Sequence, residues 1–214
     1  MNCLVVAATA IEIAPFVSHY GSAQNRLTNI DILVTGVGLT ATSYSLTRQL
    51  SLKRPGLVIQ AGLGGCFDKN KKLGTVFVVR NELIADMGVI ESTGWATVFD
   101  LGLARQNAYP FSRGRLINKN PILGKIKLPK VTGISVNEVT TSRQKMNMYG
   151  KKFAPVVESM EGAAFHYVSL MEKIPFLQLR AASNYAGERN KKNWKIQESI
   201  TNLNQELLRL LYSI

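Results

Sequence analysis

The stretch 57-LVIQAGLGG-65 decides the fold class of this chain. Its first five residues form a run that is apolar except for Gln60, and a glycine-rich stretch at residues 62–65, which predicts a turn, follows directly. A short continuous apolar run is typical of a strand buried on both faces of a sheet. Pro55 and Gly56 stand immediately before the run and end the helix that is predicted to precede it. The stretch therefore predicts one strand of a parallel sheet covered by helices.

The same alternation of strand and helix continues on both sides of this stretch. Further apolar runs predict strands at residues 4–8, 32–35, 76–79, 131–134, 154–157 and 176–182. Helical periodicity or capping predicts helices at 11–20, from Thr40 (as N-cap) towards Leu52, at 159–173, and from Trp194 to the end. Residues 86–125 are rich in Gly, Pro and Asn and predict a long irregular surface excursion. We expect one α/β domain over residues 1–214 with a mainly parallel sheet.

Length and composition exclude several classes of protein. The 214 residues are 46% hydrophobic and 19% charged, which suits one substantial core. No apolar run reaches the roughly 18–20 residues that a membrane helix needs. The start, MNCLVVAATAIEIAPF, has no basic region before its apolar stretch and no small-residue cleavage site, so it predicts a core strand and not a signal peptide. A cytoplasmic protein without membrane contact is expected.

Charge and cysteine content argue against metal ions and nucleic acid. Cys3 and Cys66 show neither a metal-ligand spacing nor a disulfide framework, and no His, Cys and acidic residues cluster. The net charge is +12, but the lysines are scattered or lie in short loop-like groups, without a basic helix face interleaved with aromatics. We predict no metal, no cofactor and no nucleic-acid partner, and a small molecule as ligand.

Four polar or glycine-rich features follow predicted strands. They are Glu12, the turn at 62–65, Ser159-Met160-Glu161 and Ser183-Asn184. In open α/β sheets, ligands bind beyond the carboxyl ends of the strands. Singly, each feature also fits a solvated acid or an ordinary turn; together they predict one ligand site. The small residues 162–164 after Glu161 indicate close packing or a ligand at that carboxylate.

These motifs make the chain similar to the purine nucleoside phosphorylase and nucleosidase superfamily, and within it to the methylthioadenosine/S-adenosylhomocysteine nucleosidases. The resemblance runs from Glu12 through GVG at 36–38, AGLGG at 61–65, ESMEGAA at 158–164 and RAASN at 180–184. It implies a twisted, mixed sheet that partly closes and is flanked by helices. It also implies a homo-oligomer, for which we expect a dimer.

Within the superfamily, the chain most resembles the futalosine hydrolases. The resemblance extends over residues 157–189, Trp194 and the central stretch ADMG…FDLGLARQN…PF between residues 85 and 111. It implies hydrolysis of the N-glycosidic bond of futalosine, a hypoxanthine nucleoside of menaquinone biosynthesis. Alternatives are a nucleosidase for methylthioadenosine, S-adenosylhomocysteine or inosine, a purine nucleoside phosphorylase, and a nucleoside-binding protein without catalysis.

The resemblance also implies roles for single residues. Glu161 accepts hydrogen bonds from both ribose hydroxyls, and its charge favours the cationic sugar that forms as the base leaves. Glu12 acts as general base on the attacking water. Met160 packs against the sugar, or is simply a core residue. Because both acids are expected at the mouth of the sheet, replacing either with Gln should spare thermal stability.

Asn184 departs from the pattern of the adenine-specific relatives, which carry Asp after the serine of this motif. An amide both donates and accepts hydrogen bonds, so it suits a 6-oxopurine such as hypoxanthine, but it delivers no proton. Ser183 is expected to orient Asn184. The resemblance places Ser159 and the backbone of residues Gly62, Leu63 and Gly64 in the substrate site as well.

Two further parts of the substrate need partners. Glu138, next to Val139 in the turn ISVNEVTTS, either accepts N1–H of hypoxanthine or is a solvated loop acid. The benzoate of futalosine needs a cation, for which Arg189 is the first candidate and Arg105 and Arg143 are the alternatives.

The stretches ATAIEIAP and IQAGLGG lack the Arg and Ser with which phosphorylases of this superfamily bind phosphate. Glu12 stands there instead, and its charge repels phosphate. Hydrolysis is therefore expected in place of phosphorolysis.

Overall fold

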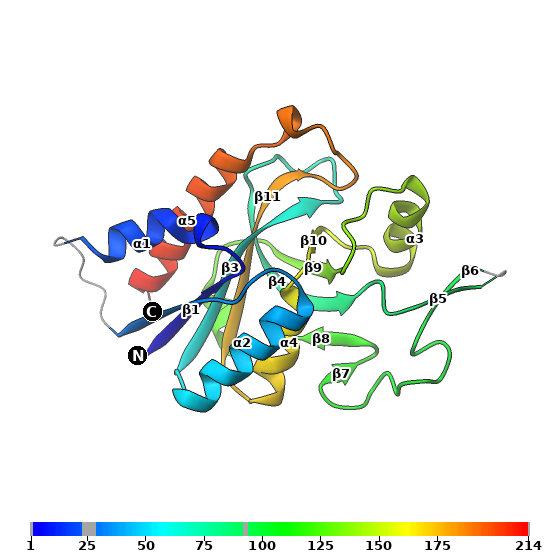
Figure 1. Cartoon of the computed structure of the whole chain (residues 1–214), viewed down its shortest axis with the longest axis horizontal. Coiled ribbons are helices and arrows are strands. Elements are labelled where there is room, and N and C mark those ends of the chain that lie inside the picture. The colour runs from blue at the N-terminus through cyan, green and yellow to red at the C-terminus, as the bar shows by residue number, and fades with distance from the viewer. Residues whose placement is uncertain (1, 23–28, 92–93, 214) are drawn as a thin grey trace.

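The central strands are apolar on both faces because helices cover both sides of the sheet. In β1 (Cys3–Ala7) every residue is buried. Cys3, Val5 and Ala7 pack towards α5 (Ile196–Ser213), whereas Leu4 and Val6 pack towards the helices on the opposite face. The computed structural model describes residues 2–22, 29–91 and 94–213. In Figure 1 the sheet runs through the middle of the molecule between these two helical layers.

Among the described residues, nine strands form one mixed sheet in the order β2-β1-β3-β10-β9-β4-β8-β7, with β11 pairing with both β3 and β4. Strands β3, β10, β9, β4 and β11 therefore form a closed ring, which confirms the expected partial closure of the sheet. The bounds are β2 (Ile30–Val34), β3 (Leu57–Cys66), β4 (Val76–Ile84), β7 (Phe111–Ser112), β8 (Arg115–Ile117), β9 (Lys130–Ser135), β10 (Val157–Ser159) and β11 (Phe176–Tyr185).

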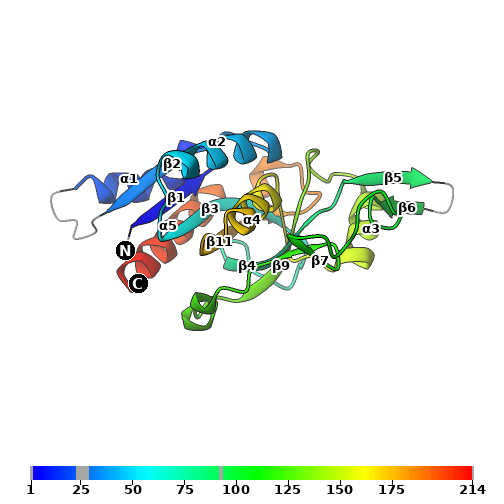
Figure 2. The ribbon, with the colours of Figure 1, turned by 90° about the horizontal axis from the view of Figure 1, so that it is seen from below.

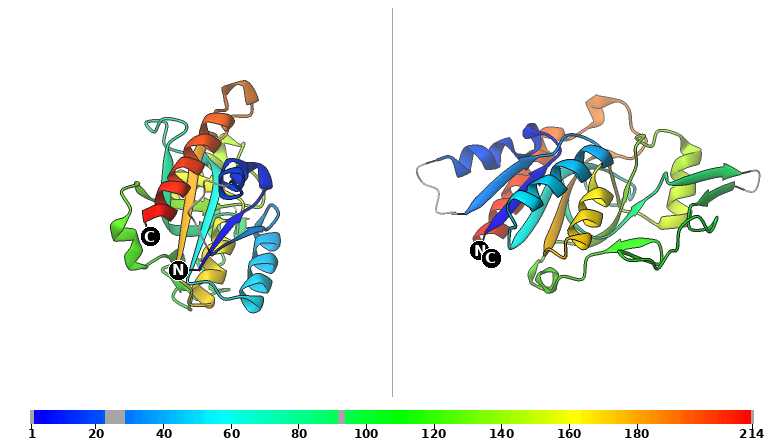
Figure 3. Two further views of the ribbon diagram at one scale, coloured as in Figure 1. Left: turned by 90° about the vertical axis from the view of Figure 1, so that its left-hand side faces the viewer. Right: turned by 60° about the horizontal axis from the view of Figure 1, so that its bottom comes forward.

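The helices divide between the two faces of the sheet, as Figures 2 and 3 show. The 3-10 turn η1 (Ala10–Ile13), α1 (Ala14–Tyr20) and α5 cover one face. On the other face α2 (Leu39–Leu52) lies against α4 (Gly162–Met171). The remaining elements are α3 (Arg143–Phe153), the hairpin β5 (Gly88–Glu91) with β6 (Gly94–Thr97), and the 3-10 turns η2 (Pro121–Lys125) and η3 (Lys191–Asn193).

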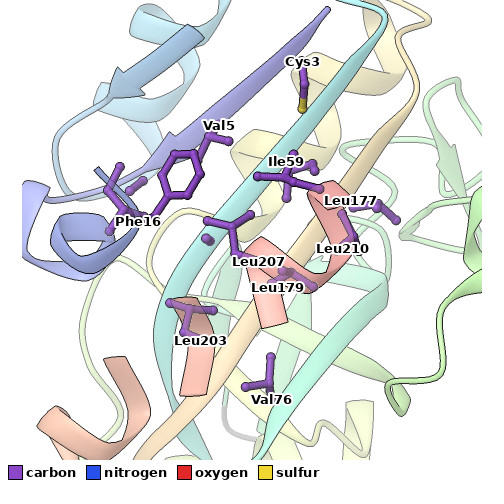
Figure 4. Packing of buried hydrophobic residues seen from close by; sticks show 14 of the residues in the cluster. Cys3, Val5, Phe16, Ile59, Val76, Leu177, Leu179, Leu203, Leu207 and Leu210 are labelled. Atoms are coloured by element: carbon purple, nitrogen blue, oxygen red, sulfur yellow. The ribbon is translucent and has the colours of Figure 1, made fainter. Parts of the chain in front are cut away.

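The predicted spacing of apolar residues in the last helix accounts for the larger core cluster. Leu203, Leu207 and Leu210 of α5 point into the sheet and contact side chains such as Ile59 and Leu179 (Figure 4). Burial of each such side chain contributes about 1.5–3 kcal/mol to stability. Because α5 is anchored in this way, the loop before it is held over the carboxyl ends of β3 and β11.

The prediction that residues 62–65 form a turn is wrong, because β3 continues through them to Cys66. The glycines instead allow neighbouring strands and side chains to approach the backbone of β3 closely. A Cβ on Gly64 would lie 2.5 Å from Val157 Cγ2 and 2.8 Å from the Glu158 carbonyl oxygen. Glycine at this position therefore permits β10 to pair with the end of β3. Likewise, the Ser183-Asn184 pair lies within β11 and not after it.

Other predicted boundaries also need correction. The N-cap of α2 is Gly38, whose φ of 96° favours glycine, so Thr40 lies inside the helix. Ala154 ends α3 in a left-handed conformation, and the strand predicted at 154–157 is β10, three residues later. The helix predicted at 159–173 accordingly begins at Gly162. Helix α3 was not predicted, and residues 86–125 contain short strands as well as loops.

No helix in the described part of the chain combines the length and the apolar character needed to cross a bilayer.

Candidate active site

A cavity of about 330 Å³ opens where strands β1, β3, β10 and β11 approach the loop before α5. Segments far apart in the sequence supply its walls. The sequence-predicted residues that line it are Glu12, Leu63, Gly64, Val139, Ser159, Met160, Glu161, Ser183, Asn184 and Arg189. Gly62 and Glu138 are not among the lining residues. The position beyond the carboxyl ends of the parallel strands is the one that the fold class predicts for a ligand.

Glu12 is held by three hydrogen bonds. Its Oε2 accepts from the Thr9 backbone N–H at 3.0 Å and from the Thr9 hydroxyl at 3.1 Å. Its Oε1 accepts from the Leu63 N–H at 2.9 Å. These bonds tie the turn η1 to β3 and fix the carboxylate at the cavity wall. Oε1 accepts only one of the three bonds, so it keeps a lone pair that can take a proton from a bound water.

Glu161 is buried with 5% of its surface exposed, and it lies at the N-cap of α4. Its Oε2 receives a hydrogen bond from Arg180 Nη1 at 3.3 Å, which is also a buried ion pair. Its Oε1 receives one from the Gly38 N–H at 3.2 Å. The Arg180 charge therefore compensates the charge of the carboxylate. Its remaining lone pairs are available to a ligand, because Glu161 lines the cavity.

The Leu63 peptide connects the two acids. Its N–H is bonded to Glu12, and its carbonyl accepts from Arg180 Nη1 at 3.2 Å. A Cβ on Gly62 would lie 2.4 Å from Arg180 Nη1 and 3.1 Å from Glu12 Oε1. Gly62 therefore contributes by its lack of a side chain, which leaves room for the guanidinium behind the cavity.

Ser183 and Asn184 lie beside a bulge in β11, where the register with β3 shifts. The Ser183 hydroxyl has two acceptors in reach, Asn184 Oδ1 at 2.9 Å and the Gly64 carbonyl at 3.3 Å, and the shorter contact is the one to the amide. Asn184 Nδ2 donates to the Tyr185 carbonyl at 3.0 Å. One N–H and one lone pair of the amide stay available for a ligand. The pair is therefore able to donate and to accept at the cavity wall.

Of the remaining charged candidates, only Arg189 lines the cavity. Glu138 is an exposed loop acid that pairs with Lys145 at 2.7 Å, which fits the solvated alternative. Arg189 lines the cavity, and its guanidinium lies 5.8 Å from the centre of the Trp194 ring. Arg105 and Arg143 do not line it.

A buried polar cluster that the sequence does not predict lies beside Glu161, which it contacts through Arg180. Arg180 and Glu82 are almost completely buried. Burial raises the pKa of Glu82 to about 7, against the opposing effects of the Arg180 charge and of hydrogen bonds such as that from Ser135 at 3.1 Å. Burial lowers the pKa of His166 to about 3, so this helix residue is neutral and packed inside. No metal-type cluster of three His, Cys, Asp or Glu residues occurs among the described residues.

Gly162, the small residue after Glu161, is the feature of the sequence that indicates this cluster. A Cβ on Gly162 would lie 2.3 Å from Gln178 Nε2 and 2.4 Å from Glu82 Oε2. The sequence indicated close packing here but not its polar partners, because these come from β4 and β11, which are distant in the chain.

Glu158 is a further acid at the site that the sequence does not predict. It lies in β10, is 6% exposed and lines the cavity. Its Oε1 accepts from the Thr140 N–H at 3.0 Å, and Oε2 is buried without a partner. Burial raises the pKa of this carboxyl. Glu158 is the first residue of the motif ESMEGAA, so the sequence shows an acid at this position. The direction of its side chain, however, depends on how β10 is placed in the sheet.

Comparison with known proteins finds a matching family model and several relatives. The model of the phosphorylase superfamily matches residues 24–213. The chain is 27% identical to the futalosine hydrolase of Thermus thermophilus over 182 residues, which cover 84% of this chain and 80% of the relative. It is 24% identical to a 5'-methylthioadenosine/S-adenosylhomocysteine nucleosidase of Haemophilus ducreyi over 198 residues, covering 86% and 78%.

The fold is also shared with solved structures. The native futalosine hydrolase of Helicobacter pylori superposes with a TM-score of 0.81 at 15% identity, and the superposition covers 100% of this chain and 98% of that one. At this identity the likeness concerns the fold, which matches the mixed, partly closed sheet between helices expected from the sequence.

Proposed function

The chain belongs to the phosphorylase superfamily and is an N-glycosyl hydrolase of the nucleosidase type, and on this premise we propose that it hydrolyses futalosine to hypoxanthine and dehypoxanthine futalosine. One observation carries the proposal. Glu12, Glu161 and Asn184 come from three distant segments and line a single cavity. These are the three groups needed to activate water, hold the ribose and bind a 6-oxopurine.

The two acids divide the work on the sugar. As the bond to the base breaks, positive charge develops on the ribose, and the fixed charge of Glu161 stabilises it while its free lone pairs accept from the ribose hydroxyls. Glu12 takes the proton of the water that attacks the anomeric carbon. The Thr9 and Leu63 hydrogen bonds hold this base in place before the substrate binds, so little reorganisation is required.

The base is bound by Asn184. Its free N–H donates to the 6-carbonyl or N7 of hypoxanthine, and its free lone pair accepts from an N–H. Asn184 gives the leaving base a hydrogen bond but no proton. The Ser183 hydroxyl fixes which atom of the amide faces which way.

Arg189 is the candidate partner for the benzoate of futalosine. It lines the cavity, and the Trp194 ring lies beside its guanidinium. A nucleosidase for methylthioadenosine is the second candidate, favoured by the relative of that name. The amide of Asn184 argues for a 6-oxopurine over adenine. The proposed role in menaquinone biosynthesis, the cytoplasmic location and the homo-oligomer stay predictions.

The proposal is tested by following base release in phosphate-free buffer. Futalosine, inosine and methylthioadenosine are compared at equal concentration, and we expect futalosine to be cleaved with the highest kcat/KM. Release of adenine from methylthioadenosine at a higher kcat/KM would favour the second candidate instead.

Adding inorganic phosphate should leave the rate and the products unchanged, because Glu12 stands where an anion would have to bind. The sugar product is identified by mass spectrometry. A sugar 1-phosphate as product would show phosphorolysis and contradict the proposal.

Changing Asn184 to Asp should shift the preference for the base away from hypoxanthine and towards adenine. The new carboxylate would oppose both the Tyr185 carbonyl, which Asn184 Nδ2 now contacts, and the 6-carbonyl of hypoxanthine. We expect a loss of about ten- to a hundredfold in kcat/KM on futalosine at neutral pH, as for an unpaired buried polar group. The loss should recover partly as the pH falls, because a protonated carboxyl can donate.

The same variant should gain on methylthioadenosine relative to futalosine, because an acid can protonate N7 of adenine. Both substrates are measured against both enzymes from acidic to neutral pH. An unchanged preference at every pH would mean that Asn184 does not contact the base.

A further inference from the structure

An acid that the mechanism does not yet use faces the cavity. Glu158 is buried, and its two carboxylate oxygens differ in their surroundings. Oε1 is bonded to the Thr140 N–H, whereas Oε2 has no partner among the described residues. A buried carboxylate oxygen without a donor is costly unless something supplies one. Two groups can supply that donor. One is a ligand, because Glu158 lines the cavity, and the other is the Thr140 hydroxyl, which is also buried without a partner and lowers the pKa of this carboxyl.

Strand register places Glu158 opposite Asn184 across the cavity floor. Gly65 of β3 pairs with Glu158 of β10 on one side and with Asn184 of β11 on the other. Residues in register on neighbouring strands point to the same face of a sheet. The two side chains therefore flank Gly65 at about two strand spacings, roughly 10 Å between backbones.

Gly65 lines the cavity and has no side chain to fill the space between them. A Cβ on Gly65 would be in ordinary van der Waals contact with Asn184 Nδ2 at 3.6 Å and with the Ala186 backbone at 3.7 Å, so the Asn184 amide lies directly beside this glycine. A flat ring lying over Gly65 would meet the amide at one edge and the acid at another.

We propose that Glu158 accepts the N1–H of the 6-oxopurine and thereby selects this base over a 6-aminopurine. The inference deepens the proposed function, on which it rests, and moves to Glu158 the role that the sequence left open for Glu138. Hypoxanthine carries a proton on N1, and the partnerless Oε2 accepts it. Adenine presents a lone pair at N1, which a carboxylate oxygen repels.

The surroundings of Glu158 keep it an acceptor. The Thr140 N–H is already bonded to Glu158, so it is not offered to the N1 lone pair of adenine. The charged and titratable groups that act on this carboxyl are Asp86, which favours protonation, and Lys145 of α3, which opposes it. Tyr149 of α3 also faces it, and burial raises the pKa of that phenol to about 12, so it stays neutral.

The test is Glu158→Gln, which keeps an oxygen for the Thr140 N–H and places an NH₂ donor where Oε2 was. We expect kcat/KM on futalosine to fall by about ten- to a hundredfold and kcat/KM on methylthioadenosine to rise relative to it. Glu172→Gln is the matched control, an exposed acid paired with Arg54 on the surface. It should leave both values unchanged.

Equilibrium binding separates this inference from the proposed function. Hypoxanthine, 1-methylhypoxanthine and adenine are titrated into the wild-type protein and the variant. Wild type should bind hypoxanthine most tightly, 1-methylhypoxanthine should lose that advantage, and the variant should shift towards adenine. If futalosine is not cleaved but this pattern holds, the proposed function fails and the role of Glu158 stands.

Two outcomes would overturn the inference while leaving the proposed function intact. One is an unchanged base preference in Glu158→Gln. The other is a reversal caused by Glu138→Gln instead. A further test uses the wild-type protein alone and measures its base preference as a function of pH. Its preference for hypoxanthine over adenine should weaken as the pH falls towards the raised pKa of Glu158, since the protonated carboxyl donates, and a preference that does not change with pH counts against the assignment.

Discussion

Replacing Glu12 with Gln is expected to lower kcat on futalosine by about a hundredfold or more, within the range of about 10² to 10⁴ that general bases contribute. The amide cannot accept the proton of the attacking water. Its oxygen still accepts from the Leu63 N–H, whereas the NH₂ faces the Thr9 N–H in place of an acceptor. Because Glu12 is only half buried, we expect a small loss of thermal stability.

Glu172→Gln, which removes an exposed acid elsewhere, is again the control, and initial rates are measured at saturating futalosine. A more direct test is chemical rescue of Glu12→Ala. Added formate should restore part of the rate, because it supplies a base. Full activity in Glu12→Gln, or a folded Glu12→Ala that formate does not rescue, would remove Glu12 from the role of base.

Glu161→Gln is expected to lower kcat/KM by about 10² to 10³, the effect of removing one electrostatic contact to the transition state. The variant loses the charge opposite the cationic sugar. Its amide also offers one acceptor fewer to the ribose hydroxyls. The readout is a comparison of inosine with 2′-deoxyinosine and 3′-deoxyinosine as substrates or competitive inhibitors.

If Glu161 holds the hydroxyls, the difference between wild type and variant should shrink on the deoxy analogues. An equal difference on all three nucleosides would mean that Glu161 acts without contacting the ribose.

The ion pair with Arg180 changes the expected effect of this variant on stability. From the sequence, both acids are expected at an open mouth, where replacement spares stability. Glu161 is instead buried, and Gln would leave the Arg180 charge without its direct counterion. Breaking a buried pair costs up to about 3–5 kcal/mol. Thermal unfolding should therefore begin at a lower temperature in Glu161→Gln than in Glu12→Gln, and equal transitions would show that the pair contributes nothing.

Several features of the fold were predictable because they depend on local pattern. The apolar run in β3 and the leucine spacing of α5 each specify an element by its own periodicity. Helix α3 was missed because it is mostly polar and presents few apolar residues, of which Tyr149 and Phe153 pack against β9. The glycines after Ala61 predict a turn, although their use is close approach between strands, which a single segment does not reveal.

The sequence by itself determined which residues are candidates for chemistry. Glu12, Glu161 and Asn184 stand next to apolar runs, and the carboxyl ends of parallel strands meet at one edge. Only the tertiary structure decided which polar groups share the cavity. Glu138 and Glu158 are both acids near predicted strand ends. Glu138 pairs with Lys145 in solvent, whereas Glu158 is buried, lines the cavity and shares its register partner Gly65 with Asn184. The reason is physical: the direction of a side chain depends on strand register, and register is set by pairing between segments that are far apart in the chain.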